Sequence, residues 1–191
     1  MSKNNFKYNN FDNLLPKHQK KIMLCLAENK PMTMSEANRK LNGENTSTTR
    51  AFHELERKRM ITETEKQEYR GRKFSKYWLS ESGVAFALMW GANPSKTERI
   101  ALTLSRGKIY FDLHSISPKI ANIIDWALIF NDGLNLEKLI QRCLLESVLM
   151  EKSERAKLLK IIKESGKFED IIKSTIEEIK KVTAEIEKTL E

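Results

Sequence analysis

Long apolar runs are absent from this 191-residue chain, which argues against a membrane-spanning helix. Such a helix needs about 18 to 20 consecutive apolar residues, and no stretch of the sequence supplies them. The N-terminal segment, MSKNNFKYNNFDN, is polar and rich in Asn, so it lacks the apolar core of a secretory signal peptide. We therefore expect a cytoplasmic protein. Residues 1–13 show no periodicity and are interpreted as a flexible arm.

Cysteine is scarce as well, which argues against a disulfide scaffold and against a zinc site built on thiolates. The two cysteines, Cys25 and Cys143, lie far apart in apolar stretches, and either kind of site needs more thiols or closer spacing. The three histidines are scattered, without metal-ligand spacing. We expect two buried structural thiols, and neither a metal nor another cofactor.

Signatures of catalysis are missing too. The sequence holds no Gly-rich phosphate loop, no nucleophile elbow and no cluster of metal ligands. Asp112 and His114 lie near each other in the chain, but no nucleophile motif accompanies them, and we expect an exposed loop there. The sequence therefore predicts a protein that is not an enzyme.

Positive charge is what the chain has in excess, and it is unevenly distributed. Residues 1–90 carry 17 Lys and Arg against 10 Asp and Glu, a net charge of +7, whereas residues 91–191 carry 17 against 16, a net charge of +1. A basic half joined to a nearly neutral half is typical of a polyanion-binding module with a second region attached. Ordinary surface lysines would give the same balance, so charge alone does not decide.

The basic half begins with two short helices separated by a break. Pro16 suits the first turn of a helix over about 16–29, and a second proline ends that helix. Thr33 lies three residues before Glu36, which is a capping-box pattern. It predicts a helix over about 34–41, which an Asn-Gly pair stops.

A third helix is predicted over 46–59, in the sequence TSTTRAFHELERKR. One face carries the residues that we expect in the core: Thr48, Ala51, Phe52 and Leu55. The other face carries short polar side chains and then cationic ones: Ser47, Thr49, Arg50, His53, Glu54 and Arg57. This spacing predicts an amphipathic helix with a polar outer face.

Two β-capable runs follow, ITETEKQEY and KFSKYWL, on either side of Arg70-Gly71-Arg72. Glycine between two arginines predicts a tight hairpin with a positively charged tip. A serine then caps a helix over about 81–90, and GANPS at 91–95 predicts a hinge. We expect the aromatic residues of the hairpin to pack against the helices: Tyr69, Tyr77 and Trp78.

The order helix, extended segment, helix, turn, helix and hairpin resembles a winged helix-turn-helix domain over about residues 16–90. PMTMSEANRKLN resembles the start of that family's second helix, and TSTTRAFHELERKRMI resembles its recognition helix. RGRKFSKYWLSESG resembles the wing and the step after it, where Tyr77, Leu79 and Gly83 match and Ser80 replaces threonine. The resemblance is closest to the multiple-antibiotic-resistance and PadR-type regulators, and it implies a DNA-binding transcription regulator.

One position departs from the pattern of this family. Such domains often have glycine before the apolar pair that leads into the first wing strand, whereas this chain has Arg59 before Met60-Ile61. The apolar positions still match, but the departure leaves the geometry of the turn open.

A helix fits the major groove of B-DNA with its N-terminal residues nearest to base edges. Ser47, Thr49 and Arg50 are therefore expected to contact bases, and Arg50 would bind a guanine with two hydrogen bonds. The wing at 69–76 is expected on the DNA backbone or in the minor groove. The remaining expected contacts are Thr46, His53, Arg57, Arg70, Arg72, Lys73 and Lys76.

The nearly neutral half is expected to be helical, with one short strand at 109–113. The helices are predicted at about 96–105, 118–131, 135–150, 153–165 and 167–190. The last helix carries one apolar stripe: Phe168, Ile172, Ile176, Ile179, Val182, Ile186 and Leu190. The stripe must be buried, either within the chain or across a two-fold dimer, and the sequence leaves both open. Trp126 and Phe130 are expected to pack in the core.

The sequence thus predicts a mainly α protein in two parts. Residues 14–92 would form a winged helix-turn-helix domain of three helices and a β-hairpin, and residues 96–191 an all-α helical domain that assembles a homodimer. The expected function is transcription regulation by binding double-stranded DNA. A winged-helix module that binds protein or RNA is the alternative, and the residues leave open whether the protein senses a small-molecule effector.

Overall fold

The computed structural model describes residues 15–43, 45–94, 100–130, 136–166 and 168–190. These residues are mainly α-helical, with one two-stranded antiparallel sheet, which confirms the expected mainly α class. None of the described helices is long and apolar enough to cross a membrane. The chain divides into two compact units, residues 1–104 and 105–191. The arm predicted at 1–13 lies outside the described residues.

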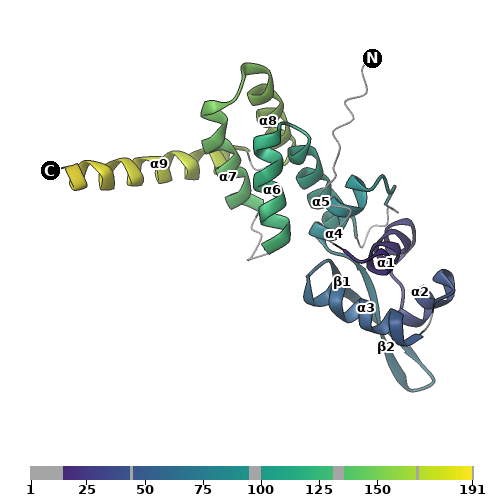
Figure 1. The fold of residues 1–191 in the computed structure, drawn as a ribbon. Coiled ribbons are helices and arrows are strands. Elements are labelled where there is room, and N and C mark those ends of the chain that lie inside the picture. Colours follow the sequence, from purple (N-terminus) through teal and green to yellow (C-terminus); the bar gives the residue numbers. More distant parts are fainter. Residues whose placement is uncertain (1–14, 44, 95–99, 131–135, 167, 191) are drawn as a thin grey trace, which may run out of the picture. The chain divides into compact units, whose positions relative to one another are not determined.

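The described residues of the first unit form α-helices and one β-hairpin (Figure 1). Its elements are α1 (Lys17–Glu28), α2 (Met34–Leu41), α3 (Asn45–Arg57), β1 (Ile61–Tyr69), β2 (Arg72–Leu79) and α4 (Glu81–Met89). Helix α1 is central, because it packs against α2, α3, α4 and β2. All elements predicted between residues 16 and 90 are therefore present, with ends shifted by one or two residues.

The predicted capping box at the start of α2 is confirmed. The Thr33 hydroxyl accepts a hydrogen bond from the backbone N–H of Glu36 (3.2 Å), and the Glu36 carboxylate accepts one from the Thr33 N–H (2.7 Å). These two bonds satisfy N–H groups that a helix start leaves without partners. At the other end Asn42 adopts the left-handed conformation (φ 48°) and stops the helix, as expected.

The hairpin is an antiparallel pair with one register shift between Glu63 and Glu65, and a two-residue turn closes it. Tyr69 is opposite Arg72 in the register, and Arg70 and Gly71 between them both have positive φ (50° and 72°). Two positive φ values are the mark of the type I′ turn, whose twist matches that of the strands. Backbone bonds in both directions also join Met32 to Tyr77, so the segment before α2 pairs with β2 on its other side.

Aromatic side chains of β2 fix the hairpin to the helices. Trp78 is fully buried, and its indole N–H donates to the carbonyl oxygen of Asn29 (3.1 Å). Tyr77 packs edge-to-face on Phe52 of α3, with ring centroids 5.6 Å apart. The packing roles predicted for Tyr77 and Trp78 are confirmed, and the Tyr69 side chain lies outside the described residues. The expected core face of α3 is buried throughout: Thr48, Ala51, Phe52 and Leu55.

The junction between α3, β2 and α4 is the tightest contact in this unit. The carbonyl oxygen of Met60 accepts from the Ser80 N–H (3.0 Å), and the Ser80 hydroxyl donates to the Arg59 carbonyl (2.6 Å). The same hydroxyl accepts from the Gly83 N–H (3.1 Å) and caps α4. A Cβ on Gly83 would lie 2.0 Å from the Met60 oxygen, so this position excludes every side chain.

The structure shows the geometry of the turn at Arg59, the position where winged helix-turn-helix domains often have glycine. Its φ is +52°, which is the left-handed conformation that glycine adopts most readily. The turn therefore has the geometry that a glycine would give, with an arginine held in it. An L-residue in this conformation costs about 1–2 kcal/mol.

The second unit is built of helices (Figure 1). Helix α5 (Ala101–His114) crosses the boundary between the units, and the following elements are α6 (Pro118–Phe130), α7 (Leu136–Glu146), the 3-10 helix η2 (Ser147–Leu149), α8 (Lys152–Glu164) and α9 (Phe168–Leu190). Helix α7 packs against α6, α8 and α9. The predicted positions of the last four α-helices agree with these bounds to within a few residues.

The strand predicted at 109–113 is wrong, because these residues lie inside α5. Gly107, Tyr110 and His114 are buried at spacings of three and four residues, so burial on one helical face overrides the β-propensity of the segment. The exposed loop expected at Asp112 and His114 is wrong for the same reason. His114 is buried, and its Nε2 lies 2.8 Å from Oδ1 of Asp125 on α6.

Trp126 is not in the core, contrary to expectation. It is 64% exposed, whereas Ile120 and Ile124 of the same helix are fully buried. The buried pair is spaced by four residues, and Trp126 follows Ile124 by two, which places it about 200° around the helix from that residue. The Phe130 side chain lies outside the described residues.

Among the described residues of the second unit, the first part of α9 is the part that packs against other helices. Ile171 and Thr175 are buried, and the Ser174 hydroxyl accepts a hydrogen bond from the side-chain amide of Gln141 on α7. Farther along, the stripe is open: Ile176, Ile179 and Val182 are 48%, 46% and 49% exposed. Figure 1 shows the same end of α9 extending past α7 and α8. Within the described part of the second unit, packing therefore leaves Ile176, Ile179 and Val182 of the predicted stripe exposed.

We predict that Gly83→Ala lowers the free energy of unfolding by about 3 kcal/mol, because the new methyl group meets a backbone oxygen that cannot move alone. Arg59→Gly is the matched change at the same junction. It should raise the free energy of unfolding by up to about 1 kcal/mol, since glycine relieves the left-handed strain. Urea denaturation of the full chain measures both. Equal stability of Gly83→Ala and wild type would contradict the tight junction.

Candidate nucleic-acid interface

The outer face of α3 presents a compact group of polar side chains. At about 100° per residue, the positions 46, 47, 50, 53, 54 and 57 fall within about 60° of Arg50. Ser47, Arg50 and His53 are exposed there, and Thr49 is exposed at the edge of the face. The side chain of Thr46 lies outside the described residues. The structure therefore brings together most of the α3 residues that the sequence singled out.

The N-terminal end of α3 is fixed to α2 by a buried polar contact. The Thr48 hydroxyl donates to Oδ1 of Asn38 (2.7 Å), and Thr48 itself is buried. Gly43 allows this approach, because a Cβ there would lie 3.0 Å from that oxygen and 3.2 Å from the Thr48 hydroxyl. Farther along the chain, Lys58 donates to the side chain of Gln19 on α1 (3.1 Å). One contact near each end of α3 therefore holds this helix, against α2 at its start and against α1 just after its last turn.

Two of the α3 side chains expected to meet DNA already have acidic neighbours. Arg57 forms an ion pair with Glu54 (2.8 Å), and His53 lies 3.9 Å from Glu56, a pair that is charged only when the histidine is protonated. The hydrogen bond to Arg57 lowers the pKa of the Glu54 carboxyl and raises that of the Arg57 guanidinium. Arg57 is therefore partly neutralised on the surface.

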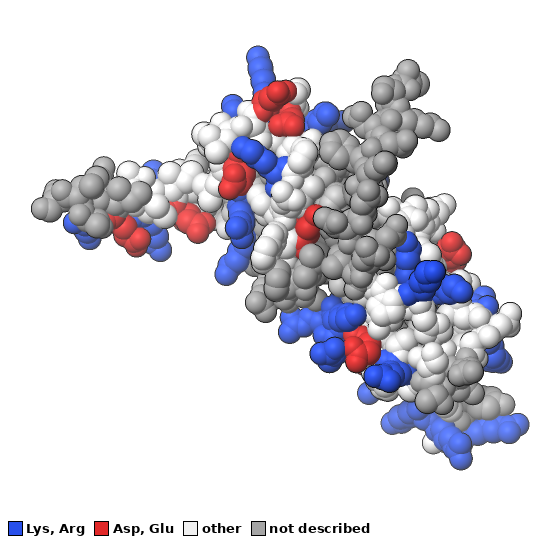
Figure 2. Space-filling view, viewed as in Figure 1, with Lys and Arg blue, Asp and Glu red and all other residues white. Residues whose placement is uncertain are grey.

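On the hairpin, too, some of the cations lie beside a carboxylate. Lys76 lies 3.0 Å from Glu65, and both side chains are half-buried. Lys73 is exposed but stands opposite Glu68 in the register. At the hairpin tip (residues 69–73) the sequence has three cations and no acid, and Arg70 and Arg72 are exposed. Figure 2 shows blue side chains gathered at this end of the hairpin.

The acidic neighbours are what sequence reasoning missed. Glu54 stands three residues before Arg57 on a helix, a spacing at which side chains meet. Glu65 and Glu68 stand across the strands from Lys76 and Lys73, as the turn at Gly71 requires. Both signals were present in the sequence. They place a carboxylate beside Arg57, Lys73 and Lys76, three of the cations expected to contact DNA.

Other kinds of site find little support in this structure. Among the described residues, no three His, Cys, Asp or Glu side chains are grouped so that they could hold a metal ion. Cys143 is buried, and burial raises the pKa of its thiol to about 12. Cys25 is half-buried rather than buried, and burial raises its thiol pKa too. Both thiols stay protonated at neutral pH and are poor nucleophiles.

The chain was also compared with known protein families, curated proteins and solved structures. No family model, no curated protein and no solved structure matches the chain. The function must therefore be inferred from the side chains and contacts described above.

Proposed function

We propose that residues 14–92 form a winged helix-turn-helix domain, and that the protein is a transcription regulator that binds double-stranded DNA. The supporting order is α1, an extended segment paired with β2, α2, α3, the hairpin and α4. The observation that carries the proposal is the exposed polar face of α3, which a hydrogen bond from Thr48 joins to α2. The same unit has a hairpin with arginines at its tip. A helix face of this kind fits the major groove.

In the proposed complex, the N-terminal part of α3 lies in the major groove. Ser47, Thr49 and Arg50 face base edges, where Arg50 donates two hydrogen bonds to a guanine. Thr46 and His53 bind phosphate or the nearest base. The arginines of the hairpin tip and Lys73 bind the backbone or the adjacent minor groove.

The ion pairs predict which cations contribute more to DNA affinity and which contribute less. Arg57 and Lys76 must each leave a carboxylate before they bind a phosphate, since Glu54 and Glu65 hold them at 2.8 and 3.0 Å. Arg57 and Lys76 therefore contribute less of the affinity than Arg50 and Arg72 do. This ranking sharpens the set of contacts expected from the sequence.

A second candidate function is binding to single-stranded RNA, and one side chain favours it. Phe74, next to the hairpin tip, is 40% exposed among cationic residues. An exposed aromatic ring between cations is able to stack on an unpaired base. Phe74→Ala should weaken RNA binding strongly if this function holds, and should leave duplex binding nearly unchanged if the protein binds duplex DNA.

For duplex DNA we predict an affinity that falls steeply with salt, as condensed counterions are released. Arg50→Ala should reduce binding to the preferred sequence by about five- to 150-fold and reduce discrimination between sequences. Arg72→Ala should weaken all sequences alike and reduce the salt slope by about one. Selection from a genomic fragment pool, followed by electrophoretic shifts, measures both. A protein that retards no fragment at low salt would sink the proposal.

Glu65→Gln should tighten DNA binding about two- to fivefold, because the change removes a negative charge from the wing and releases Lys76. Glu28→Gln is the matched control, since it removes the same charge from an exposed position on α1. Titrations at one fixed salt concentration compare the two variants. Equal affinities would show that the Glu65–Lys76 pair does not limit the wing.

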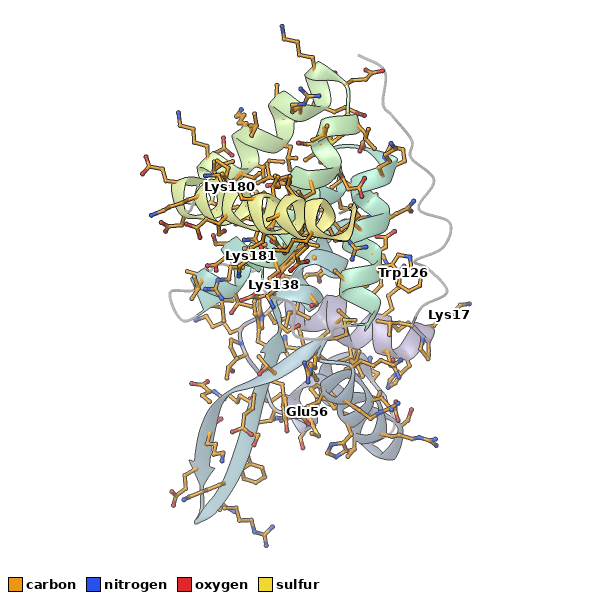
Figure 3. The ribbon with its side chains drawn as sticks, turned by 90° about the vertical axis from the view of Figure 1, so that its left-hand side faces the viewer. Lys17, Glu56, Trp126, Lys138, Lys180 and Lys181 are labelled. Carbon is orange, nitrogen blue, oxygen red and sulfur yellow. The ribbon has the colours of Figure 1, made fainter. Side chains whose placement is uncertain are left out.

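We further propose that the protein acts as a homodimer through its C-terminal helices. The open stripe of Ile176, Ile179 and Val182 supports this, because an apolar stripe on a protruding helix requires a partner surface. Charged side chains of both signs flank the stripe, among them Lys180 and Lys181 (Figure 3). A two-fold dimer would present two DNA-binding domains to two half-sites.

Ile179→Glu should convert the dimer into a monomer, because it places a charge in the centre of the stripe. Ala184→Glu is the matched control, since position 184 lies about 140° around the helix from Ile179 and is exposed. Light scattering at several concentrations gives the mass of each protein. A wild-type mass of one chain throughout would remove the dimer, and a dimeric Ile179→Glu would place the contact elsewhere.

A further inference from the structure

Glu54 occupies an unexpected place for an acid on a DNA-binding face. It follows Arg50 by one helical turn and precedes Arg57 by three residues, so all three side chains leave α3 on the same side. The Arg57 guanidinium holds its carboxylate at 2.8 Å.

The carboxylate of Glu54 carries a negative charge in the free protein. The hydrogen bond from Arg57 lowers its pKa, so it is ionised at neutral pH. A negative charge brought toward phosphates is repelled unless a strong donor faces it. In the major groove the strong donors are the amino groups of cytosine and adenine, and guanine O6 and thymine O4 are acceptors that a carboxylate avoids.

Cytosine is the better match of the two amino-bearing bases. Its major-groove edge offers the N4 amino group alone, whereas adenine places the acceptor N7 beside its N6 amino group. A carboxylate has only acceptors, so adenine N7 would oppose it. An amide side chain has both a donor and an acceptor and suits adenine instead.

We propose that Glu54 is a specificity-determining residue that accepts a hydrogen bond from the amino group of a cytosine, with Arg57 holding the carboxylate in position. This inference rests on the proposed duplex-DNA function. Glu54 and Arg50 are four residues apart, about 6 Å along the helix axis. The cytosine should therefore lie one or two base pairs from the guanine that Arg50 binds, at about 3.4 Å per base pair.

Glu56 supplies the matched control on the same helix. It stands two residues after Glu54, about 200° around α3. Burial raises the pKa of Tyr77, and the charge of Glu56 raises it further, which places Glu56 toward the hairpin. It is also exposed at the surface (Figure 3). A change from Glu to Gln there alters the net charge by the same amount. It removes the acidic neighbour of His53 at 3.9 Å and keeps the Glu54–Arg57 pair.

The experiment is selection from a pool of randomised duplexes with the full chain, its Glu54→Gln variant and its Glu56→Gln variant. The wild-type protein should enrich cytosine at one position in each half-site, by between about five- and 150-fold over the other bases. Glu54→Gln should change that preference to adenine, and Glu56→Gln should keep cytosine. Circular dichroism of each variant verifies that the fold is intact.

The other outcomes separate the inference from the function on which it rests. Glu54→Gln that weakens all duplexes alike and keeps the wild-type preference would make Glu54 a positioning residue for Arg57 and overturn the base-reading role. A preference that changes equally in Glu56→Gln would overturn it as well. A wild-type protein that enriches no duplex would overturn the DNA-binding function itself.

Discussion

The first unit depends on the contact between the backbone of Gly83 and the carbonyl oxygen of Met60. Because Gly83 has no side chain, α4 begins directly over the end of α3. There Ser80 forms hydrogen bonds to the carbonyl oxygens of Arg59 and Met60, and its hydroxyl also caps α4. The direction in which the hairpin leaves α3 is set at this point. A shift of a few tenths of an ångström here would be magnified along nine residues of strand before it reached the arginines at the tip.

Carboxylates shape the surface of the same unit as much as cations do. A net charge of +7 over residues 1–90 suggests a broadly basic face, but Glu54, Glu65 and Glu68 stand beside cations along α3 and both strands. Charge of one sign spread evenly would bind any polyanion. Opposed charges leave a few defined points of contact, and a mismatched ligand then meets repulsion as well as lost attraction.

Features encoded within a few residues were predictable from the sequence, and features that depend on tertiary burial were not. The capping box at Thr33, the turn at Gly71 and the amphipathic face of α3 are local, and the structure confirms them. The segment at 109–113 has strand-forming residues, but Tyr110 is buried on a helical face. Trp126 has the composition of a core residue and is exposed. In the candidate site, the exposed polar and cationic residues were predictable from the sequence. Their acidic neighbours are found only when the spacing of residues along α3 and the pairing of residues across the hairpin are both considered.

The two-residue turn at the end of the hairpin has a consequence for the cost of binding. A loop that orders on contact loses conformational entropy of about 1–2 kcal/mol per residue, whereas Arg70 and Gly71 already occupy one defined turn geometry, with φ values of 50° and 72°. The backbone at the hairpin tip therefore loses little conformational entropy when the arginines bind a partner. Glycine or asparagine at position 70 would form the same turn with less strain, so the chain trades stability of the isolated hairpin for a guanidinium at its outermost point.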